Sequence, residues 1–200
     1  MKNLILIGGG GHCKACIDVI EETEKFNIVG VLDKPEFVGK SVLGYNILGG
    51  DDMIEPLVQE NHEFLITVGQ IRTHQIRYGL YGKLLECNAS LATVISPRAY
   101  VSKYALIGPG TIIMHDALVS VDARVGQNCI INSKALIEHD VVVGDHCHIS
   151  TGAVVNGNVF VKHGVFWGSN AVSREGVVVE PMSFVQAGSV VSDNKAKCRG

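Results

Sequence analysis

The residues best suited to acid–base chemistry lie in a short acidic run in the C-terminal half of the chain. His139 is flanked by Glu138 and Asp140. A carboxylate next to an imidazole fixes its tautomer and favours its cationic form, which raises its basicity. Such an imidazole is a candidate general base. A solvated histidine in an acidic stretch explains the same residues, so the run by itself leaves both interpretations open.

A second candidate site lies near the N-terminus, where an apolar run ends in four glycines and a histidine. Residues 2–8 predict a strand, and the polar–apolar pattern that continues to about Glu24 predicts a helix. Such a turn leaves N–H groups pointing toward a phosphate. The next predicted strand, residues 28–33, ends in Asp33, which can accept hydrogen bonds from a ribose or a base. A turn that needs glycine only for its backbone gives the same pattern.

The rest of the N-terminal third is consistent with a small α/β unit. Residues 64–69 predict a third strand that also ends in glycine, and residues 72–85 predict a helix. Residues 43–52 (LGYNILGGDD) are expected to form a loop. We place the boundary of this unit near residue 90.

The C-terminal half repeats every six residues without a break in phase. From Ile95 to Val191 every sixth residue is apolar except Ser173, and nearly all of them are Ile or Val. The residue four positions after each is small or β-branched, and Cys129 and Cys147 occupy two of these positions. Layers of this kind cannot bury their apolar face alone, so they stack into a solenoid. We interpret these two cysteines as packing residues.

Composition excludes several classes of protein. The 200 residues are 46% hydrophobic and 18% charged, which suits a sizeable core and not a disordered chain. A net charge of −3 without a dense basic run argues against nucleic-acid binding. No stretch approaches the ~18 apolar residues of a membrane span, and the apolar N-terminal run is too short for a signal peptide. We therefore expect a cytoplasmic protein.

The six cysteines do not form the paired framework of a small secreted domain. Cys13 and Cys16 form a CxxC, which is a redox motif in other contexts. Two small residues on one turn of a helix account for it equally simply, and we prefer that interpretation.

The six-residue repeat resembles the left-handed parallel β-helix of hexapeptide acyltransferases. This resemblance implies three hexapeptides per coil, about five and a half coils over residues 95–194, and a homotrimer with active sites between subunits. The predicted fold is an α/β, Rossmann-like nucleotide-binding subdomain followed by this β-helix. The predicted domains are a nucleotide-sugar-binding domain, residues 1–90, and an acetyltransferase domain, residues 91–200.

A more specific resemblance rests on motifs that occur in order along the chain. They are GGGGHCK at residues 8–14, Asp33, Val68 and Gly69, ISP at residues 95–97, Asn132, IEHD at residues 137–140, HISTG at residues 148–152, and NGNV at residues 156–159. Together they are similar to the NeuD/PglD-like family of sugar O- and N-acetyltransferases. The resemblance extends from Leu4 to Val191.

This family resemblance implies roles for particular residues. It implies that His139 is the catalytic base, that Asp140 is the acid supporting it, and that Asn132 lies beside the reacting groups. The substrate-binding residues that it implies are Gly10, Gly11, His12, Asp33, Lys34 and Gly69. The residues that it implies for coenzyme A are His148, Gly157, Gly168, Ser169 and Ala187. Acetyl-CoA is the implied co-substrate, and no metal is implied.

The implied activity is acetyl-CoA-dependent N-acetylation of the 4-amino group of a nucleotide-linked 4-amino-4,6-dideoxy sugar. Within the family, O-acetylation of a sialic acid is also possible, although His12 after the glycines favours a nucleotide sugar. Two hypotheses lie outside this chemistry. One is a metal enzyme using His139, His146 and His148, in the manner of γ-type carbonic anhydrases. The second is a non-catalytic scaffold that binds a nucleotide sugar.

Three departures from the family pattern affect these expectations. The last residues, 191–200, lack the usual Gly-x-Pro-Ala-Lys stretch, which leaves the adenine end of the coenzyme site undefined. Residues 69–72 (GQIR) replace the commoner Gly-Asn/Asp-Asn. Ser173 and Trp167 depart from the inward Ile/Val pattern, so distorted coils are expected near them.

Overall fold

The structure is a computed structural model that describes residues 1–71 and 73–192, and it divides into two compact units. The first unit comprises residues 1–69 and 75–94. The second begins at Ile95 and also includes the segment 70–74, which lies outside it in sequence. Each unit is described separately below.

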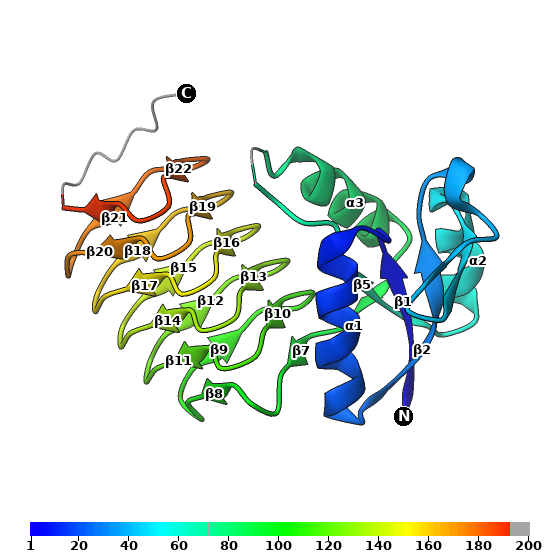
Figure 1. Ribbon diagram of the computed structural model, residues 1–200, viewed down its shortest axis with the longest axis horizontal. Helices are drawn as coiled ribbons and strands as arrows, with labels where there is room; N and C mark the ends of the chain where they lie inside the picture. Colours follow the sequence, from blue (N-terminus) through cyan, green and yellow to red (C-terminus); the bar gives the residue numbers. More distant parts are fainter. Residues whose placement is uncertain (72, 193–200) are drawn as a thin grey trace. The chain divides into compact units, whose positions relative to one another are not determined.

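The first unit is built on a six-stranded sheet of order β3-β4-β2-β1-β5-β6, in which β3 is antiparallel to β4 and the other pairs are parallel. Figure 1 labels its strands β1, β2 and β5 and the helices α1, α2 and α3. The elements of this unit are β1 (Lys2–Ile7), α1 (Gly11–Thr23), β2 (Phe26–Leu32), the 3₁₀ turn η1 (Pro35–Phe37), β3 (Ser41–Val42), β4 (Tyr45–Gly49), the 3₁₀ turn η2 (Asp51–Met53), α2 (Ile54–Gln59), β5 (Glu63–Ile66), α3 (Gln75–Glu86) and β6 (Ser90–Leu91). The α/β fold expected of this part is confirmed.

The central strands of this sheet are apolar because both of their faces are covered. Leu4, Ile5 and Leu6 of β1 are fully buried, as are Phe64 and Leu65 of β5. The loop expected over residues 43–52 is wrong, because Tyr45–Gly49 forms strand β4 beside β2. Its alternating pattern, with Ile47 and Gly49 buried and Asn46 and Leu48 exposed, marks a strand that the flanking glycines concealed.

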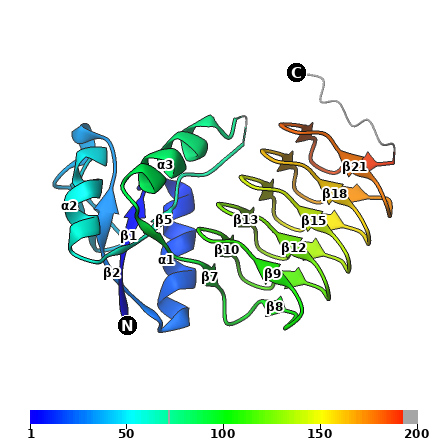
Figure 2. The ribbon, with the colours of Figure 1, turned by 180° about the vertical axis from the view of Figure 1, so that it is seen from behind.

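The second unit is a stack of two-residue strands joined by tight turns, as Figures 1 and 2 show from opposite sides. The strands form three parallel sheets, of order β22-β19-β16-β13-β10-β7, β23-β20-β17-β14-β11-β8 and β21-β18-β15-β12-β9. Their bounds are β7 (Val94–Ile95), β8 (Tyr100–Val101), β9 (Leu106–Ile107), β10 (Ile112–Ile113), β11 (Leu118–Val119), β12 (Arg124–Val125), β13 (Ile130–Ile131), β14 (Leu136–Ile137), β15 (Val142–Val143), β16 (His148–Ile149), β17 (Val154–Val155), β18 (Phe160–Val161), β19 (Phe166–Trp167), β20 (Val172–Ser173), β21 (Val178–Val179), β22 (Phe184–Val185) and β23 (Val190–Val191).

Each strand pairs with the strand eighteen residues later, as in Leu118 with Leu136 and Ile137 with Val155. Three hexapeptides therefore make one coil, and the predicted left-handed β-helix is confirmed. The second residue of each strand points inward, and from Ile113 onward it is almost completely buried. Cys129 and Cys147 are fully buried among these inward residues, in agreement with a packing role.

A second periodicity lies in the turns. Three residues after each inward residue from Ile107 to Val185, the backbone adopts a left-handed conformation with φ between 52° and 71°. The residues at these positions are Gly110, Asp116, Asp122, Asn128, Lys134, Asp140, His146, Gly152, Asn158, Gly164, Asn170, Gly176, Met182 and Gly188. Gly, Asn and Asp tolerate this conformation best, which explains their frequency here.

The two departures from the inward pattern have different consequences. Trp167 is fully buried, its Nε1 donates to Ala171 O at 3.1 Å, and its strand keeps the regular register with Val185. At Ser173 the hydrogen bonds between neighbouring coils differ from the regular pattern. Asn156 N donates to Ser173 Oγ at 2.8 Å, and Asn156 Nδ2 donates to Ser173 O at 2.6 Å. The expected distortion is therefore confined to this turn.

The longest helix among the described residues is α1, with 13 residues, and none of the described helices combines the length and hydropathy needed to cross a membrane.

Candidate active site

The predicted general base lies in the turn that follows β14. The Nδ1 atom of His139 is 2.8 Å from Oδ2 of Asp140. A carboxylate oxygen accepts, so Nδ1 carries the proton and Nε2 of the neutral ring keeps its lone pair. The His139 side chain is about half exposed, at 50%. The structure thus brings His139 and Asp140 together as the sequence predicted, with Nε2 available to a substrate.

The backbone of this turn also depends on Asp140. Its φ of 60° is one of the left-handed turn positions, and its N–H donates to Val121 O at 3.2 Å. Asp is one of the few residues with a side chain that adopt this conformation readily. Asp140 therefore has a conformational role as well as an electrostatic one.

Carboxylates around His139 raise its pKa above the usual value. The largest cause is the hydrogen bond to Asp140, and the negative charges of Asp140, Glu138 and Glu175 act in the same direction. Glu138 also accepts the backbone N–H of His139 at 3.3 Å. The imidazole is consequently a stronger base than an isolated histidine.

Gly157 lies against the His139 ring. A Cβ at this position would lie 2.7 Å from Cε1 and 2.8 Å from Nε2 of His139. His139, Gly157 and Glu175 are eighteen residues apart, so they occupy the same turn in three successive coils. The family resemblance implies a role for Gly157 in binding coenzyme A, whereas in the structure it provides the space for the imidazole.

A separate hydrogen-bonded set joins Asn132, His148 and Gln70 within the second unit. Nδ1 of His148 lies within hydrogen-bond distance of Gln70 O, and Nε2 of His148 is 3.2 Å from Nδ2 of Asn132. Because a carbonyl oxygen only accepts, Nδ1 carries the proton and Asn132 donates to Nε2. This orients the Asn132 amide, whose Oδ1 accepts from Ser133 N at 2.8 Å. The sequence identifies Gln70 only as a departure from the family pattern.

Gln70 and Phe166 hold His148 from two directions. Gln70 is almost fully buried, and its Nε2 donates to His146 O at 3.1 Å. The His148 ring meets Phe166 edge-on at 5.2 Å between centroids, and Phe166 stacks on Phe184 at 4.9 Å. His148 is thus a buried, oriented imidazole on an aromatic ladder.

Within one chain, Asn132 and His139 occupy different corners of the same coil. Asn132 lies in the turn before β14, and His139 lies in the turn after it. The two predicted catalytic groups are thus at opposite edges of the sheet that contains β14.

Gly168, Ser169 and Ala187, which are also assigned to coenzyme A, lie at the same corner as Asn132 in later coils. Gly168 approaches the next coil so closely that a Cβ would lie 2.5 Å from Ala187 N and 2.6 Å from Val185 O. Ser169 Oγ is 2.9 Å from Ser150 Oγ. Gly168 is therefore required for the stacking of the coils, whatever it binds.

In the first unit, Asp33 organises the glycine-rich turn. Its Oδ2 accepts from Gly9 N at 2.7 Å, and its Oδ1 accepts from Lys34 N at 2.8 Å. Gly8 has a φ of 103° and packs so tightly on Val68 that a Cβ there would lie 2.4 Å from Cγ2 of Val68. Gly8 is thus required by its backbone conformation and its close packing, and the Asp33 carboxylate holds the turn in place.

The next residues of the turn, Gly10 and Gly11, are exposed. Gly10 is the N-cap of α1, and apart from chain neighbours and the backbone of α1 itself no described atom lies within 4 Å of a Cβ placed at Gly10 or Gly11. Gly69 lies beside His12, since a Cβ on Gly69 would be 3.5 Å from Cβ of His12. These residues follow β1 and β5, where the strand order reverses, and ligands of open α/β sheets bind at such a point. Lys34 lies close by, next to Asp33 at the end of β2.

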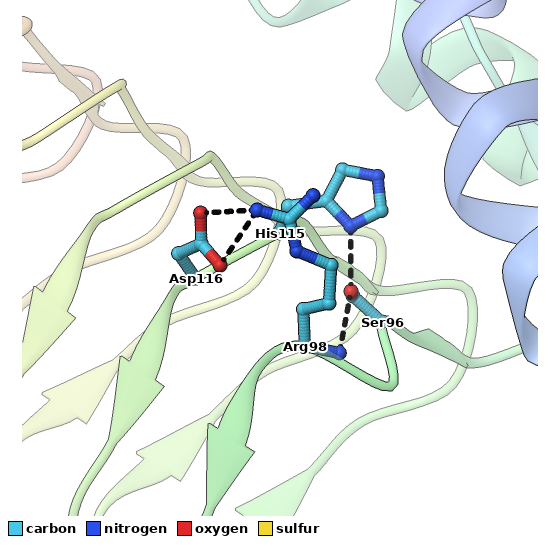
Figure 3. Close-up of polar contacts among 4 residues, drawn as sticks. All are labelled: Ser96, Arg98, His115 and Asp116. Atoms are coloured by element: carbon cyan, nitrogen blue, oxygen red, sulfur yellow. Dashed lines mark hydrogen bonds and ion pairs between the residues drawn. The ribbon is translucent and has the colours of Figure 1, made fainter.

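One polar cluster was not foreseen from the sequence. Ser96 Oγ is 2.7 Å from Nδ1 of His115, and Arg98 forms an ion pair with both carboxylate oxygens of Asp116 at 2.8 and 3.1 Å (Figure 3). Ser96 is buried, with 1% of its surface exposed. A hydroxyl this inaccessible is unsuited to nucleophilic attack, so the cluster joins the first two coils structurally.

The cysteines and the histidines complete the candidate groups. Cys13 and Cys16 lie side by side in α1, fully buried, and burial raises the pKa of both thiols, that of Cys16 strongly. This suits packing and not thiolate chemistry. Residues 1–71 and 73–192 contain no group of three His, Cys, Asp or Glu side chains placed to hold a metal ion.

Comparison with known proteins matches each part of the chain. The family described as the PglD N-terminal domain matches residues 3–79, and the bacterial transferase hexapeptide family (six repeats) matches residues 122–157. The UDP-N-acetylbacillosamine N-acetyltransferase of Bacillus subtilis (strain 168) is 34% identical over 125 residues, 57% of this chain. The match covers 52% of that protein, so the chain spans about half the length of this curated relative.

Solved structures are similar over nearly the whole chain. The acetyltransferase domain of PglB from Neisseria gonorrhoeae FA1090 has a TM-score of 0.90 and 28% identity, covering 98% of this chain and 94% of that one. The same domain was solved with acetyl coenzyme A, with a TM-score of 0.87, 26% identity and coverages of 96% and 94%. PerB from Caulobacter crescentus, solved with CoA and GDP-perosamine, has a TM-score of 0.85 and 26% identity, covering 96% and 92%. These matches confirm that the chain resembles the PglD-like sugar acetyltransferases in both of its parts.

Proposed function

We propose that this protein is an acetyl-CoA-dependent N-acetyltransferase that acts on the 4-amino group of a nucleotide-linked 4-amino-4,6-dideoxy sugar. The observation that carries the proposal is the His139–Asp140 pair, in which Nδ1 bonds to the carboxylate at 2.8 Å and Nε2 remains available. The activities of the relatives support it, since one acts on a UDP-linked sugar by its name and another was solved with CoA and GDP-perosamine.

In the proposed reaction His139 is the general base and Asp140 supports it. The amine nitrogen forms a bond to the thioester carbon of acetyl-CoA, and the C–S bond breaks. Nε2 takes the proton that the nitrogen loses and returns it to the sulfur, which leaves as the free thiol. Much of the acceleration comes from holding the two substrates together.

We propose that residues 1–90 form the domain that binds the nucleotide sugar and that residues 91–200 form the domain that binds acetyl-CoA. Gly10, Gly11, His12, Asp33, Lys34 and Gly69 would hold the nucleotide sugar, with the phosphates at the N-terminus of α1. The residues that would hold acetyl-CoA are His148, Gly157, Gly168, Ser169 and Ala187. Since nucleotide sugars and acetyl-CoA are cytoplasmic metabolites, we place the reaction in the cytoplasm.

We further propose a homotrimer with its active sites between subunits. Within one chain Asn132 and His139 lie at opposite edges of the sheet containing β14, so a second copy is needed to bring such groups together. The outer faces of two sheets of the β-helix carry exposed apolar side chains, among them Tyr100, Leu118 and Val190 on one and Leu106 and Phe160 on the other. Exposed apolar rows of this kind are typical of interfaces. Light scattering after gel filtration should give three times the chain mass.

The activity is tested by incubating the protein with acetyl-CoA and a panel of acceptors while free thiol is measured. The panel holds UDP-, dTDP- and GDP-linked 4-amino-4,6-dideoxy sugars and free sialic acid. Thiol release with one nucleotide-linked amino sugar, lost in His139→Ala while nucleotide-sugar binding is kept, is the expected result. Release only with sialic acid would replace the proposal with O-acetylation. A sugar that binds without thiol release in the wild-type protein would indicate a non-catalytic scaffold.

A further inference from the structure

Carboxylates surround His139 on more than one side, and they come from different coils. Glu138 and Asp140 flank it in the chain, and both bond to atoms of His139 itself. Glu175 comes from the equivalent turn two coils further along. The stacking of the coils therefore places the negative charge of Glu175 near a turn that already contains Glu138 and Asp140.

Glu175 approaches His139 on the side of the available nitrogen. Oε1 of Glu175 lies 3.4 Å from the point where a Gly157 Cβ would be, and Nε2 of His139 lies 2.8 Å from the same point. Because Gly157 has no side chain, the carboxylate and the basic nitrogen border one small space. Asp140, in contrast, is engaged with Nδ1 on the other side of the ring.

We infer that Glu175 is a specificity-determining residue, which binds the acceptor as a protonated amine beside His139. The inference rests on the proposed function and narrows its substrate class to a cationic amino sugar. Before proton transfer the ammonium group carries the positive charge, and afterwards the imidazolium carries it. A neighbouring carboxylate stabilises that charge in both positions.

The same charges discriminate against an anionic acceptor. A sialic acid would bring its own carboxylate toward Glu138, Asp140 and Glu175, and like charges repel. A neutral hydroxyl acceptor gains no attraction on binding. The acidic turn therefore favours N-acetylation of an amine over O-acetylation of an anionic sugar.

The proton balance is consistent with an acceptor that arrives as an ammonium. Nε2 takes the first proton and leaves a free amine, which attacks the thioester carbon. Nε2 passes that first proton to solvent, takes a second proton from the attacking nitrogen and delivers it to the sulfur as the C–S bond breaks. Each turnover then yields the amide, the free thiol of coenzyme A and one proton released to solvent.

The test compares Glu175→Gln with Glu180→Gln, which removes the same charge at another corner of the β-helix. The acceptor is the nucleotide-linked amino sugar that the wild type acetylates. At low ionic strength Glu175→Gln should raise KM about three- to fivefold with little change in kcat, as expected for a charge pair that involves an exposed side chain. This increase in KM should be smaller at high salt, and it should also be smaller in Glu175→Asp. The KM of Glu180→Gln should equal that of the wild type.

Sialic acid provides an independent readout, since Glu175→Gln should leave any turnover of this anionic sugar unchanged or increase it. An unchanged KM for the amine in Glu175→Gln, or an equal change in Glu180→Gln, would overturn the role of Glu175 and leave the proposed activity intact. A wild-type protein that acetylates no amine in the panel would overturn both. Circular dichroism and thermal melting confirm that each variant is folded.

Discussion

The backbone of Gly157 borders the imidazole of His139 so closely that a single methyl group there would lie 2.7 Å from Cε1. This contact joins two consecutive coils at the proposed site. It explains why glycine follows Asn156 at a turn whose left-handed position belongs to the next residue, Asn158. The requirement at residue 157 is for space and not for an unusual φ.

Gly157→Ala should therefore impair catalysis more than stability. The added methyl displaces the His139 ring from its bond to Asp140, and a misplaced catalytic group costs on the order of 10²-fold in rate. Steady-state thiol release gives the rate. Gly82→Ala, in α3, where the new methyl meets no described atom within 4 Å apart from chain neighbours and the helix's own backbone, is the control and should keep full activity. Equal rates in Gly157→Ala and the wild type would contradict the contact.

Asp140→Asn should change the pH dependence of the reaction. Asparagine tolerates the left-handed φ of 60°, so the turn is kept while the charge is removed. Asp140 raises the pKa of His139, so its removal lowers that pKa, and the acidic limb of kcat/KM should move to lower pH. The plateau rate should fall about tenfold or more because a weaker base is less effective.

Asp122→Asn is the matched control for this variant. Asp122 occupies the same turn position one coil earlier, with a φ of 56°. Its pH profile should coincide with that of the wild type. An Asp140→Asn profile with an unmoved acidic limb would show that His139 does not titrate as the base.

Asn132→Asp should change the protonation of His148. In the wild type, Asn132 donates to Nε2 and Gln70 O accepts from Nδ1, so the ring is neutral with its proton on Nδ1. An aspartate places an acceptor opposite Nε2, which favours a second proton on the ring. Nitrogen-15 NMR of His148 should show the Nδ1–H tautomer in the wild type and the cation in the variant. A wild-type proton on Nε2 would contradict the assignment.

Asp33→Asn should loosen the glycine-rich turn. Both carboxylate oxygens accept backbone N–H groups, from Gly9 and Lys34, and an amide can replace only one of these acceptors. The expected cost is about 1–2 kcal/mol of stability, together with weaker binding of the accepted nucleotide sugar. Calorimetry measures both quantities. Glu36→Gln, at an exposed neighbouring position, should leave them unchanged.

Trp167→Ala should destabilise the β-helix by about 3–5 kcal/mol, the usual cost of truncating a buried aromatic residue. Trp167 is fully buried and donates to Ala171 O, whereas Trp167→Phe keeps most of the volume and should cost much less. Chemical denaturation at a fixed protein concentration measures the difference. A small loss in Trp167→Ala would mean that the interior can collapse around the cavity.

The sequence alone determined the architecture, because its signals are local and repeated. An inward Ile or Val every six residues, with a small residue four positions later, specifies a stacked coil whose neighbours are always eighteen residues apart. The strand, glycine turn and helix at the N-terminus, with Asp33 after the next strand, likewise lie within short segments. His139 and Asp140 are adjacent, so their pairing also follows from the chain.

Only the tertiary structure decided the contacts made between coils and loops. Gly157 and Glu175 reach His139 because equal turns stack on one another, and no local pattern specifies which side chain faces which. Gln70 bonds to His148 although 78 residues separate them, and it belongs to the same unit as the β-helix while the preceding Gly69 belongs to the other. Strand β4 has an alternating pattern that the flanking glycines concealed, and its pairing with β2 is a contact between segments that no local pattern shows. Packing between distant segments, which periodicity does not encode, therefore completes the site.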